Sequence, residues 1–207
     1  MSNINKFEPF QLDVLQEIGN IGSGNATTAL SNLINKSVDM KVPKVNFGPF
    51  SAITESLGDA EKAVIAVYLR VVGETPGNMY FLLSQKSANQ LLSDVLQMDL
   101  INKKEYSDIE ISALTEIGNI LAGSYLSSLA NLTHLKIFPS VPSLSMDMLG
   151  AVLSSGMLQS GQYDDYALLI ETNFLEGSEN VEGNFIFIPD PGSLHKIFHS
   201  LGVPIHD

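Results

Sequence analysis

The side chains best suited to chemistry in this chain form a polar set of three that occurs twice with the same spacing. The first set lies within Asp13–Asn20 and the second within Ser112–Asn119, ninety-nine residues later. Each set has an acid or a hydroxyl, then a glutamate and then an asparagine, at positions i, i+4 and i+7. At about 100° per residue, these positions share an arc of roughly 60° on one side of a helix. The six residues are Asp13, Glu17, Asn20, Ser112, Glu116 and Asn119.

A carboxylate and a carboxamide without a nucleophile or a base suggest a reaction whose electrophile comes from a partner. A carboxamide takes up no proton at neutral pH, but it donates hydrogen bonds to a water and accepts them, and so holds that water in line for attack. The neighbouring carboxylate can bind a cation. The pair therefore suits hydrolysis of a phosphoryl group that is already bound, with its metal, on another protein, as a water-positioning glutamine does in GTPases.

Apolar residues opposite the polar sets predict two long amphipathic helices, at residues 10–33 and at about residues 107–132, the second with Ser107 or Asp108 as its N-cap. One polar set alone would indicate only a solvated helix face. Two sets, each pointing away from an apolar stripe, favour a function and should face solvent or a partner. The predicted buried stripes are Val14, Leu15, Ile18, Ile21, Ala26, Ala29 and Leu33 in the first helix and Leu114, Ile117, Leu121 and Leu132 in the second.

Glycines inside these segments admit two interpretations. The run Gly19–Gly24 resembles a phosphate-binding loop, but it lacks the Lys-Ser/Thr of a P-loop and no predicted strand precedes it. We expect instead that the glycines allow close backbone approach, to a neighbouring helix or to a partner, at a cost to the helix of about 1 kcal/mol each.

The remaining segments follow in the same order in both halves. We expect turns within residues 52–62, and Pro43 predicts a bulged or edge strand. The predicted fold is α/β (α+β): a duplicated helix–strands–helix unit with pseudo-two-fold symmetry, an antiparallel-rich sheet and both long helices on one face. The expected organisation is a single domain, residues 1–207, built from repeats at about 8–100 and 105–207. The predicted strands are 38–47, 63–72, 78–84, 166–174 and 183–188, and the predicted shorter helices are 86–98 and 193–201.

Composition narrows the class of protein. A net charge of −12 argues against a nucleic-acid partner, which requires a basic face, and fits a partner with a basic patch. No apolar run reaches the roughly 20 residues of a membrane span, and the start of the chain lacks the features of a signal peptide. The absence of cysteine excludes disulfides, thiol catalysis and zinc–thiolate sites. These features predict a cytoplasmic protein without a membrane span.

Other candidate sites are weaker. His195 and His199 have the i, i+4 spacing of metal ligands but lack a matching third carboxylate, so we expect surface histidines and no metal site. Asp147 lies between Met146 and Met148, where it is either a solvated acid at a turn or strand edge or a contact for a partner protein.

The doubled [Asp/Ser]-x-x-x-Glu-x-x-Asn motif, within EIGNIGSGNATTAL and EIGNILAGSYLSSL, resembles the CheC family of chemotaxis phosphatases in the CheC/CheX/FliY superfamily. Two motifs in a chain of this length are most similar to the CheC branch, because CheX has one motif and FliY adds a further domain. The resemblance extends over essentially the whole chain. It implies hydrolysis of the aspartyl phosphate of the response regulator CheY, and binding of CheD, the receptor deamidase.

The resemblance also implies a role for each motif residue. Asn20 and Asn119 would orient the attacking water, and Glu17 and Glu116 would pair with a lysine of the regulator. Mg²⁺ would come from the regulator, so no cofactor of the chain's own is expected, and a monomer is favoured. The alternative is a non-catalytic adaptor that binds CheD or the regulator. The first motif positions, Asp13 and Ser112, would have a supporting role.

Overall fold

The computed structural model describes residues 9–160, 166–176 and 179–203. These residues form six helices and one sheet of seven strands, and none of the helices within these ranges has the length and apolarity that crossing a membrane requires. In chain order the elements are α1 (Pro9–Ile34), β1 (Asp39–Pro49), α2 (Phe50–Ser56), β2 (Ala63–Gly73), β3 (Gly77–Leu83), α3 (Gln85–Leu96), α4 (Asp108–Thr133), β4 (Ile137–Pro139), β5 (Ser143–Met148), α5 (Leu149–Ser160), β6 (Tyr166–Glu176), β7 (Glu179–Pro189) and α6 (Ser193–Ser200).

The sheet interleaves the two halves of the chain. Its strand order is β1-β6-β7-β3-β2-β4, β5 also pairs with β2, and every pairing is antiparallel. The hairpin of each half therefore lies beside the first strand or strands of the other half: β1 pairs with β6, and β4 and β5 pair with β2. This confirms the predicted mixed α/β fold with an antiparallel sheet.

The pairing of β3 with β7 locates the pseudo-two-fold axis. Tyr80 lies opposite Ile186, and these two positions are 106 residues apart, the same offset that relates Gly77 to Gly183. In an antiparallel pair, a position that faces its own equivalent marks the centre of two-fold symmetry. The axis therefore passes between Tyr80 and Ile186, in the middle of the sheet.

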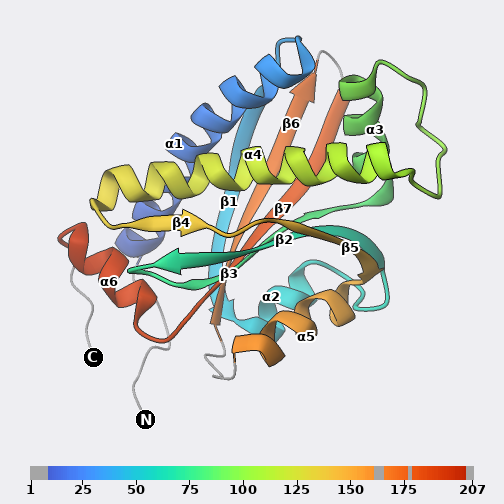
Figure 1. Cartoon of the computed structure of the whole chain (residues 1–207). Helices are drawn as coiled ribbons and strands as arrows, with labels where there is room; N and C mark the ends of the chain where they lie inside the picture. Colours follow the sequence, from blue (N-terminus) through green and yellow to red (C-terminus); the bar gives the residue numbers. More distant parts are fainter. Residues whose placement is uncertain (1–8, 161–165, 177–178, 204–207) are drawn as a thin grey trace.

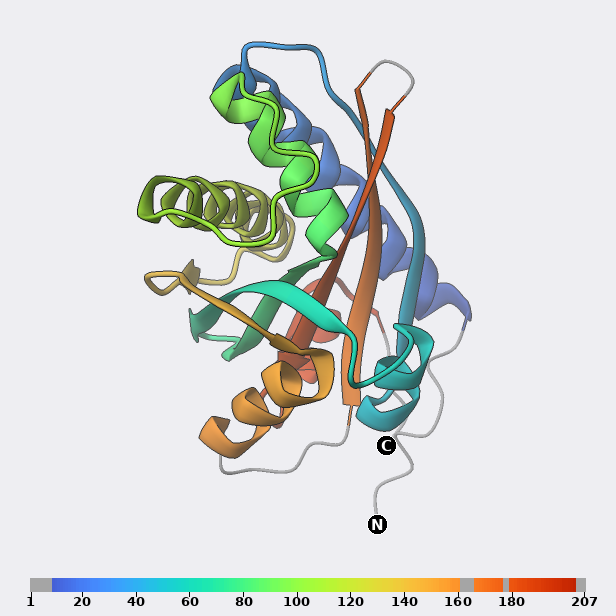
Figure 2. The ribbon, with the colours of Figure 1, turned by 90° about the vertical axis from the view of Figure 1, so that its right-hand side faces the viewer.

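Helices cover both faces of the sheet. Because side chains alternate along a strand, Ile65, Val67 and Leu69 of β2 enter a core shared with α1, α3, α4 and α6, whereas Val64 and Ala66 enter a second core shared with α2 and α5. Figures 1 and 2 show α2 and α5 together at the bottom of the molecule, away from α3 and α4. Both long helices lie on one face, as predicted.

The predicted helices and strands are found within a few residues of their expected ends. Pro43 lies at a register shift between Lys41 and Lys44 of β1, an edge strand, as its sequence predicted. Ser107 is the N-cap of α4, and its backbone N–H donates to the Glu110 carboxylate at 2.7 Å.

Two parts of the prediction were wrong. Ile21, Leu33 and Leu132 are 37–38% exposed, because each helix buries a narrower arc than its apolar residues span, and Leu30 and Ile34 are buried in α1 instead. Helices α2 and α5 and the short strands β4 and β5 were not predicted. They are short segments whose few apolar residues cover the second face or the edge of the sheet.

Candidate functional site

The polar set of α1 points out of the molecule. Asp13, Glu17 and Asn20 are all exposed, whereas Leu15 and Ile18 between them are buried at 4% and 8% exposure. Carboxylate and carboxamide groups on this face are therefore available to a partner without any movement of the core.

The polar set of α4 is arranged in the same way, but two of its members share a weak hydrogen bond. Ser112 and Glu116 are exposed and Asn119 is half-buried. The Asn119 side-chain amide donates to a Glu116 carboxylate oxygen at 3.5 Å, which is beyond the usual range of a strong hydrogen bond. So weak a contact leaves both groups free to exchange it for bonds to water or to a partner.

The glycine between each glutamate and asparagine brings the helix onto the sheet. A Cβ added at Gly19 would lie 3.4 Å from Val42 of β1, and one added at Gly118 would lie 2.6 Å from Val67 of β2. The Gln16 side-chain amide also donates to the carbonyl of Val42 at 2.7 Å. These contacts fix the rotation of each helix about its axis and so direct the polar face outward.

The two helices contact each other beyond the polar sets. Gly22 lies against the ring of Tyr125, and the Asn25 amide donates to the Ser128 hydroxyl at 2.9 Å. Figure 1 shows α1 and α4 crossing, with the start of α1 at the lower left and the start of α4 at the right. Because each polar set lies in the first half of its helix, the structure presents two separate polar faces and does not bring all six residues together.

Lys103, Ser107 and Glu110 form a polar cluster at the start of α4. Glu110 is 4% exposed, and its carboxylate accepts from the Lys103 ammonium at 2.5 Å and from the Ser107 hydroxyl at 2.8 Å. The ammonium of Lys103, with further hydrogen bonds from Ser107, lowers the pKa of Glu110 to about 2. Sequence reasoning identified the cap residue but not the role of Glu110, although the Ser-x-x-Glu spacing is a capping-box signal.

A further polar cluster joins β2, β3 and the end of β7. The Arg70 guanidinium donates to both carboxylate oxygens of Asp190 and to the Asn78 carbonyl oxygen, which also accepts from the Tyr68 hydroxyl. The Asp190 carboxylate raises the pKa of Arg70. The members of this cluster bond to one another, so it ties strands together rather than forming an open site.

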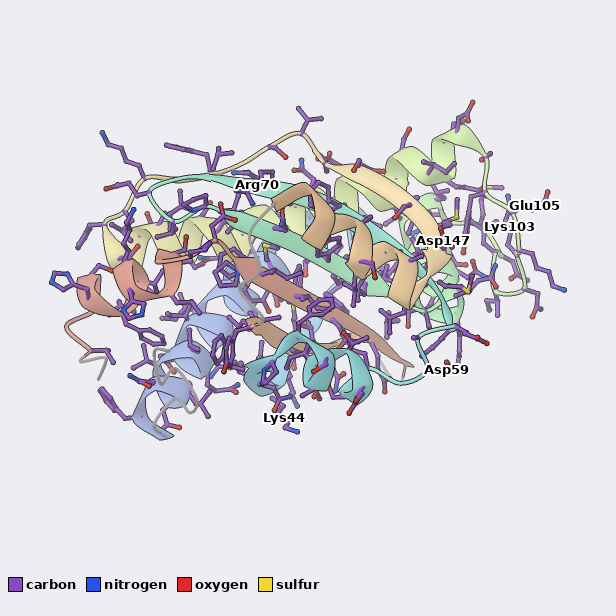
Figure 3. All side chains as sticks on the ribbon, turned by 90° about the horizontal axis from the view of Figure 1, so that it is seen from below. Lys44, Asp59, Arg70, Lys103, Glu105 and Asp147 are labelled. Carbon is purple, nitrogen blue, oxygen red and sulfur yellow. The ribbon has the colours of Figure 1, made fainter. Side chains whose placement is uncertain are left out.

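Asp147 lies on β5, at the edge of the sheet. This agrees with the prediction of an acid at a turn or strand edge. Asp147 is exposed between Met146 and Met148, which are 47% and 49% exposed. These three residues line a groove of about 330 Å³ together with Lys104 and Tyr106. Figure 3 shows Asp147 on the side of the molecule from which Lys103 and Glu105 project. The residues that line this groove do not include the motif residues.

The part of the chain that the structure describes contains no group of three His, Cys, Asp or Glu side chains placed to hold a metal. On α6, His195 is half-buried and His199 is exposed. That the protein needs no metal of its own stays a prediction.

Comparison with known proteins finds the family in both halves of the chain. The model of the CheC-like family matches residues 10–47 and 109–146. These segments begin ninety-nine residues apart and cover all but the first residue of each long helix. The chain is 34% identical, over 99% of its length and 100% of that protein, to the CheY-P phosphatase CheC of Bacillus subtilis (strain 168). It is also 28% identical to the flagellar motor switch phosphatase FliY of the same organism, over 69% of the chain and 37% of that protein.

Solved structures agree on the fold. The crystal structure of Thermotoga maritima FliY superposes with a TM-score of 0.76 at 18% identity, covering 95% of this chain and 98% of that one. Identity over the whole length, a family match in both halves and a shared fold lead to one conclusion: this chain belongs to the CheC-like family.

Proposed function

We propose that this protein is a phosphatase that hydrolyses the aspartyl phosphate of a CheY-type response regulator, at the exposed polar faces of α1 and α4. The observation that carries the proposal is the presence of an outward glutamate and asparagine on both helices, in a chain 34% identical over its whole length to a CheY-P phosphatase. The protein is accordingly a hydrolase, and we further propose that it acts in the cytoplasm together with the regulator.

In the proposed reaction, a water attacks the phosphorus atom and the bond from phosphorus to the aspartyl oxygen breaks. The products are inorganic phosphate and the free carboxylate of the regulator. Asn20 or Asn119 donates a hydrogen bond to the water and accepts one from it, which holds the water in line with the breaking bond. The Mg²⁺ bound by the regulator neutralises charge on the phosphoryl oxygens, so this chain supplies position rather than a cofactor.

Glu17 and Glu116 contribute docking in this proposal. Both carboxylates are exposed in the free protein, where an ion pair stabilises little because water screens it. Docking against a lysine of the regulator would desolvate the pair, and truncating one partner of a desolvated interfacial pair costs roughly 2–5 kcal/mol. Asp13 and Ser112, one turn earlier on the same faces, would support the contact from its rim.

We also propose that CheD binds this chain through a different surface. The exposed Asp147, flanked by Met146 and Met148 along a groove, combines a charge with flexible apolar side chains. Such a surface suits a protein partner with a basic group opposite the acid. Because the groove does not include the motif residues, CheD and the regulator would contact different residues of this chain.

The decisive experiment measures phosphate release from a phosphorylated CheY-type regulator and, in parallel, binding to that regulator. We expect Asn20→Ala combined with Asn119→Ala to abolish turnover while binding is nearly retained, and Glu17→Ala combined with Glu116→Ala to weaken binding. Asn32→Ala with Asn131→Ala is the matched control, since these residues are exposed and equivalent in the two helices but lie off the polar faces.

The outcomes separate the alternatives. Turnover by the double Asn20/Asn119 variant at the wild-type rate would refute the water-positioning role. A wild-type protein that binds the regulator or CheD but releases no phosphate would establish the adaptor instead of the phosphatase.

A further inference from the structure

The helix glycines differ in what a side chain at each position would touch. A Cβ added at Gly22 would lie 2.5 Å from the Tyr125 ring, and one added at Gly118 would lie 2.6 Å from Val67. At Gly24 and Gly123 an added Cβ would have no neighbouring atom within 4 Å. Packing within the described chain therefore accounts for the first two glycines and not for Gly24 and Gly123.

Neither of these two glycines serves the helix itself. Helix α1 continues to Ile34 and α4 to Thr133, so Gly24 and Gly123 are not at helix ends, where glycine is favoured. Inside a helix, glycine is unfavourable because it loses more backbone entropy on folding than alanine does. The same unfavourable choice at equivalent positions of both helices points to a contact outside this chain.

The positions of Gly24 and Gly123 around their helix axes indicate what this contact is. Gly24 follows Asn20 by four residues and Gly123 follows Asn119 by four. At about 100° per residue, each glycine falls in the middle of the roughly 60° arc of its polar set. The helix surface one turn beyond each asparagine thus has no side chain, and it is continuous with the glutamate–asparagine face.

We propose that Gly24 and Gly123 each form a seat, meaning a stretch of helix surface without a side chain, against which the rim of the partner's phosphorylation site packs during the reaction. This inference rests on the proposed phosphatase function and deepens it. An asparagine carries its carboxamide only one methylene from the backbone, so the helix backbone must come close to the aspartyl phosphate. A side chain one turn along on the same face would hold the partner away, whereas glycine lets the partner's main chain meet the helix.

The occupant is the surface that surrounds the aspartyl phosphate of the regulator. On the regulator, this surface adjoins the groups that the motif residues contact in the proposed complex. These motif residues are Glu17 and Asn20 on α1, and Glu116 and Asn119 on α4. Gly24 and Gly123 are positioning residues in this scheme: they touch neither the water nor the phosphoryl group, and they set how deeply each asparagine inserts.

The test compares three double variants of the full chain. Gly24→Leu with Gly123→Leu fills the seat, and Gly24→Ala with Gly123→Ala fills it minimally. Asn32→Leu with Asn131→Leu is the matched control, because it adds the same bulk at exposed, equivalent positions off the face. The readouts are KM and kcat for phosphate release, Tm, and Kd for the regulator carrying beryllofluoride and Mg²⁺, a stable mimic of its phosphorylated state.

We expect the leucine pair to raise Kd and KM at least about tenfold without lowering Tm, and the control to stay within about twofold of the wild type. The alanine pair should raise Tm, by roughly 2–4 °C per site, while it raises KM. A gain in stability together with a loss of docking is not expected of residues with a merely structural role.

Wild-type binding and turnover in the leucine pair would overturn the inference and leave the proposed function intact. If leucine lowers Tm, the alanine pair decides: a raised KM supports the seat, and an unchanged KM overturns it. A wild-type protein that neither binds nor dephosphorylates the regulator would overturn the proposed function, and this inference with it.

Discussion

Helices α1 and α4 carry equivalent polar faces but are supported differently. Beneath the face of α4, Leu114, Ile117 and Leu121 are 0% exposed, and Gly118 presses on Val67 of β2, a strand with neighbours on both sides. The start of α4 is further fixed by its polar cap. This helix is held rigidly at its start and along its buried side.

Support under α1 is looser. Leu15 and Ile18 keep 4% and 8% of their surface exposed. A Cβ added at Gly19 would lie at ordinary contact distance from Val42 of β1, an edge strand. No acidic residue lies in the first turn of α1, where a carboxylate would stabilise the helix. The duplicated motif therefore preserved the outward face in both halves while the packing beneath it diverged.

The largest expected effect tests whether two differently supported faces work independently. Each helix carries a complete set, and the sets lie in the first halves of helices that meet farther along. Asn20→Ala should therefore remove only the turnover of α1, and Asn119→Ala only that of α4, each by about 10²–10³-fold at its own site. Phosphate release by the wild type, both single variants and the double variant measures the shares, which should sum to the whole. Complete loss from either single variant, with the other helix folded and binding, would show one composite site.

The next effect contrasts the packing of the two motif glycines. Gly118→Ala places a methyl group against the Cβ of Val67 in a paired strand that has little room to move, and should lower the free energy of unfolding by about 3 kcal/mol. Gly19→Ala places its methyl group at ordinary contact distances of 3.4–3.8 Å from side-chain atoms of Val42, Val45 and Ile170. It should stay within about 1 kcal/mol of the wild type, since alanine also favours the helix. Urea denaturation of both variants measures the difference. Equal losses would contradict the looser support of α1.

A smaller effect concerns the helix crossing, where the two halves differ in shape. Gly22 accommodates the ring of Tyr125, whereas the equivalent positions are Leu121 and Ala26. Gly22→Ala should cost about 2 kcal/mol, because the ring can yield only in part. Gly22→Ala should cost less stability in a protein that already carries Tyr125→Leu than it does in the wild type. A double-mutant cycle by urea denaturation measures this coupling. Additive losses would mean that the clash lies elsewhere.

The smallest effect concerns the polar cap at the start of α4. Glu110→Gln should reduce stability at pH 7 by about 1 kcal/mol, as expected for a capping side chain. Because the pKa of Glu110 is lowered to about 2 in the folded protein, its contribution is complete above the usual carboxyl range and is lost as the pH falls from about 4.5 towards 2. In acid titrations, the difference between the unfolding free energies of wild type and variant should therefore change as the pH falls from about 4.5 towards 2. Parallel curves over that range would exclude the proposed role of the carboxylate.

Local periodicity in the sequence was enough to predict the two long helices and the direction of their polar side chains. The 3.6-residue period predicted α1 and α4 and the outward direction of Glu17, Asn20, Glu116 and Asn119, because a helix fixes the direction of each side chain without reference to the rest of the fold. Pro43 likewise predicted a bulge at an edge, since it cannot donate to a neighbouring strand. The repetition itself made the two-fold arrangement and the family evident.

Tertiary structure decided everything that depends on a distant neighbour. Strand pairing between halves placed β1 beside β6 and β5 beside β2, and no local pattern encodes which remote strand completes an edge. Short α2 and α5 follow from the need to cover the second face of the sheet rather than from their own periodicity. A glycine has no side chain whose polarity would indicate its surroundings. Only the packed structure could therefore show that Gly22 and Gly118 meet neighbouring side chains while Gly24 and Gly123 lie open.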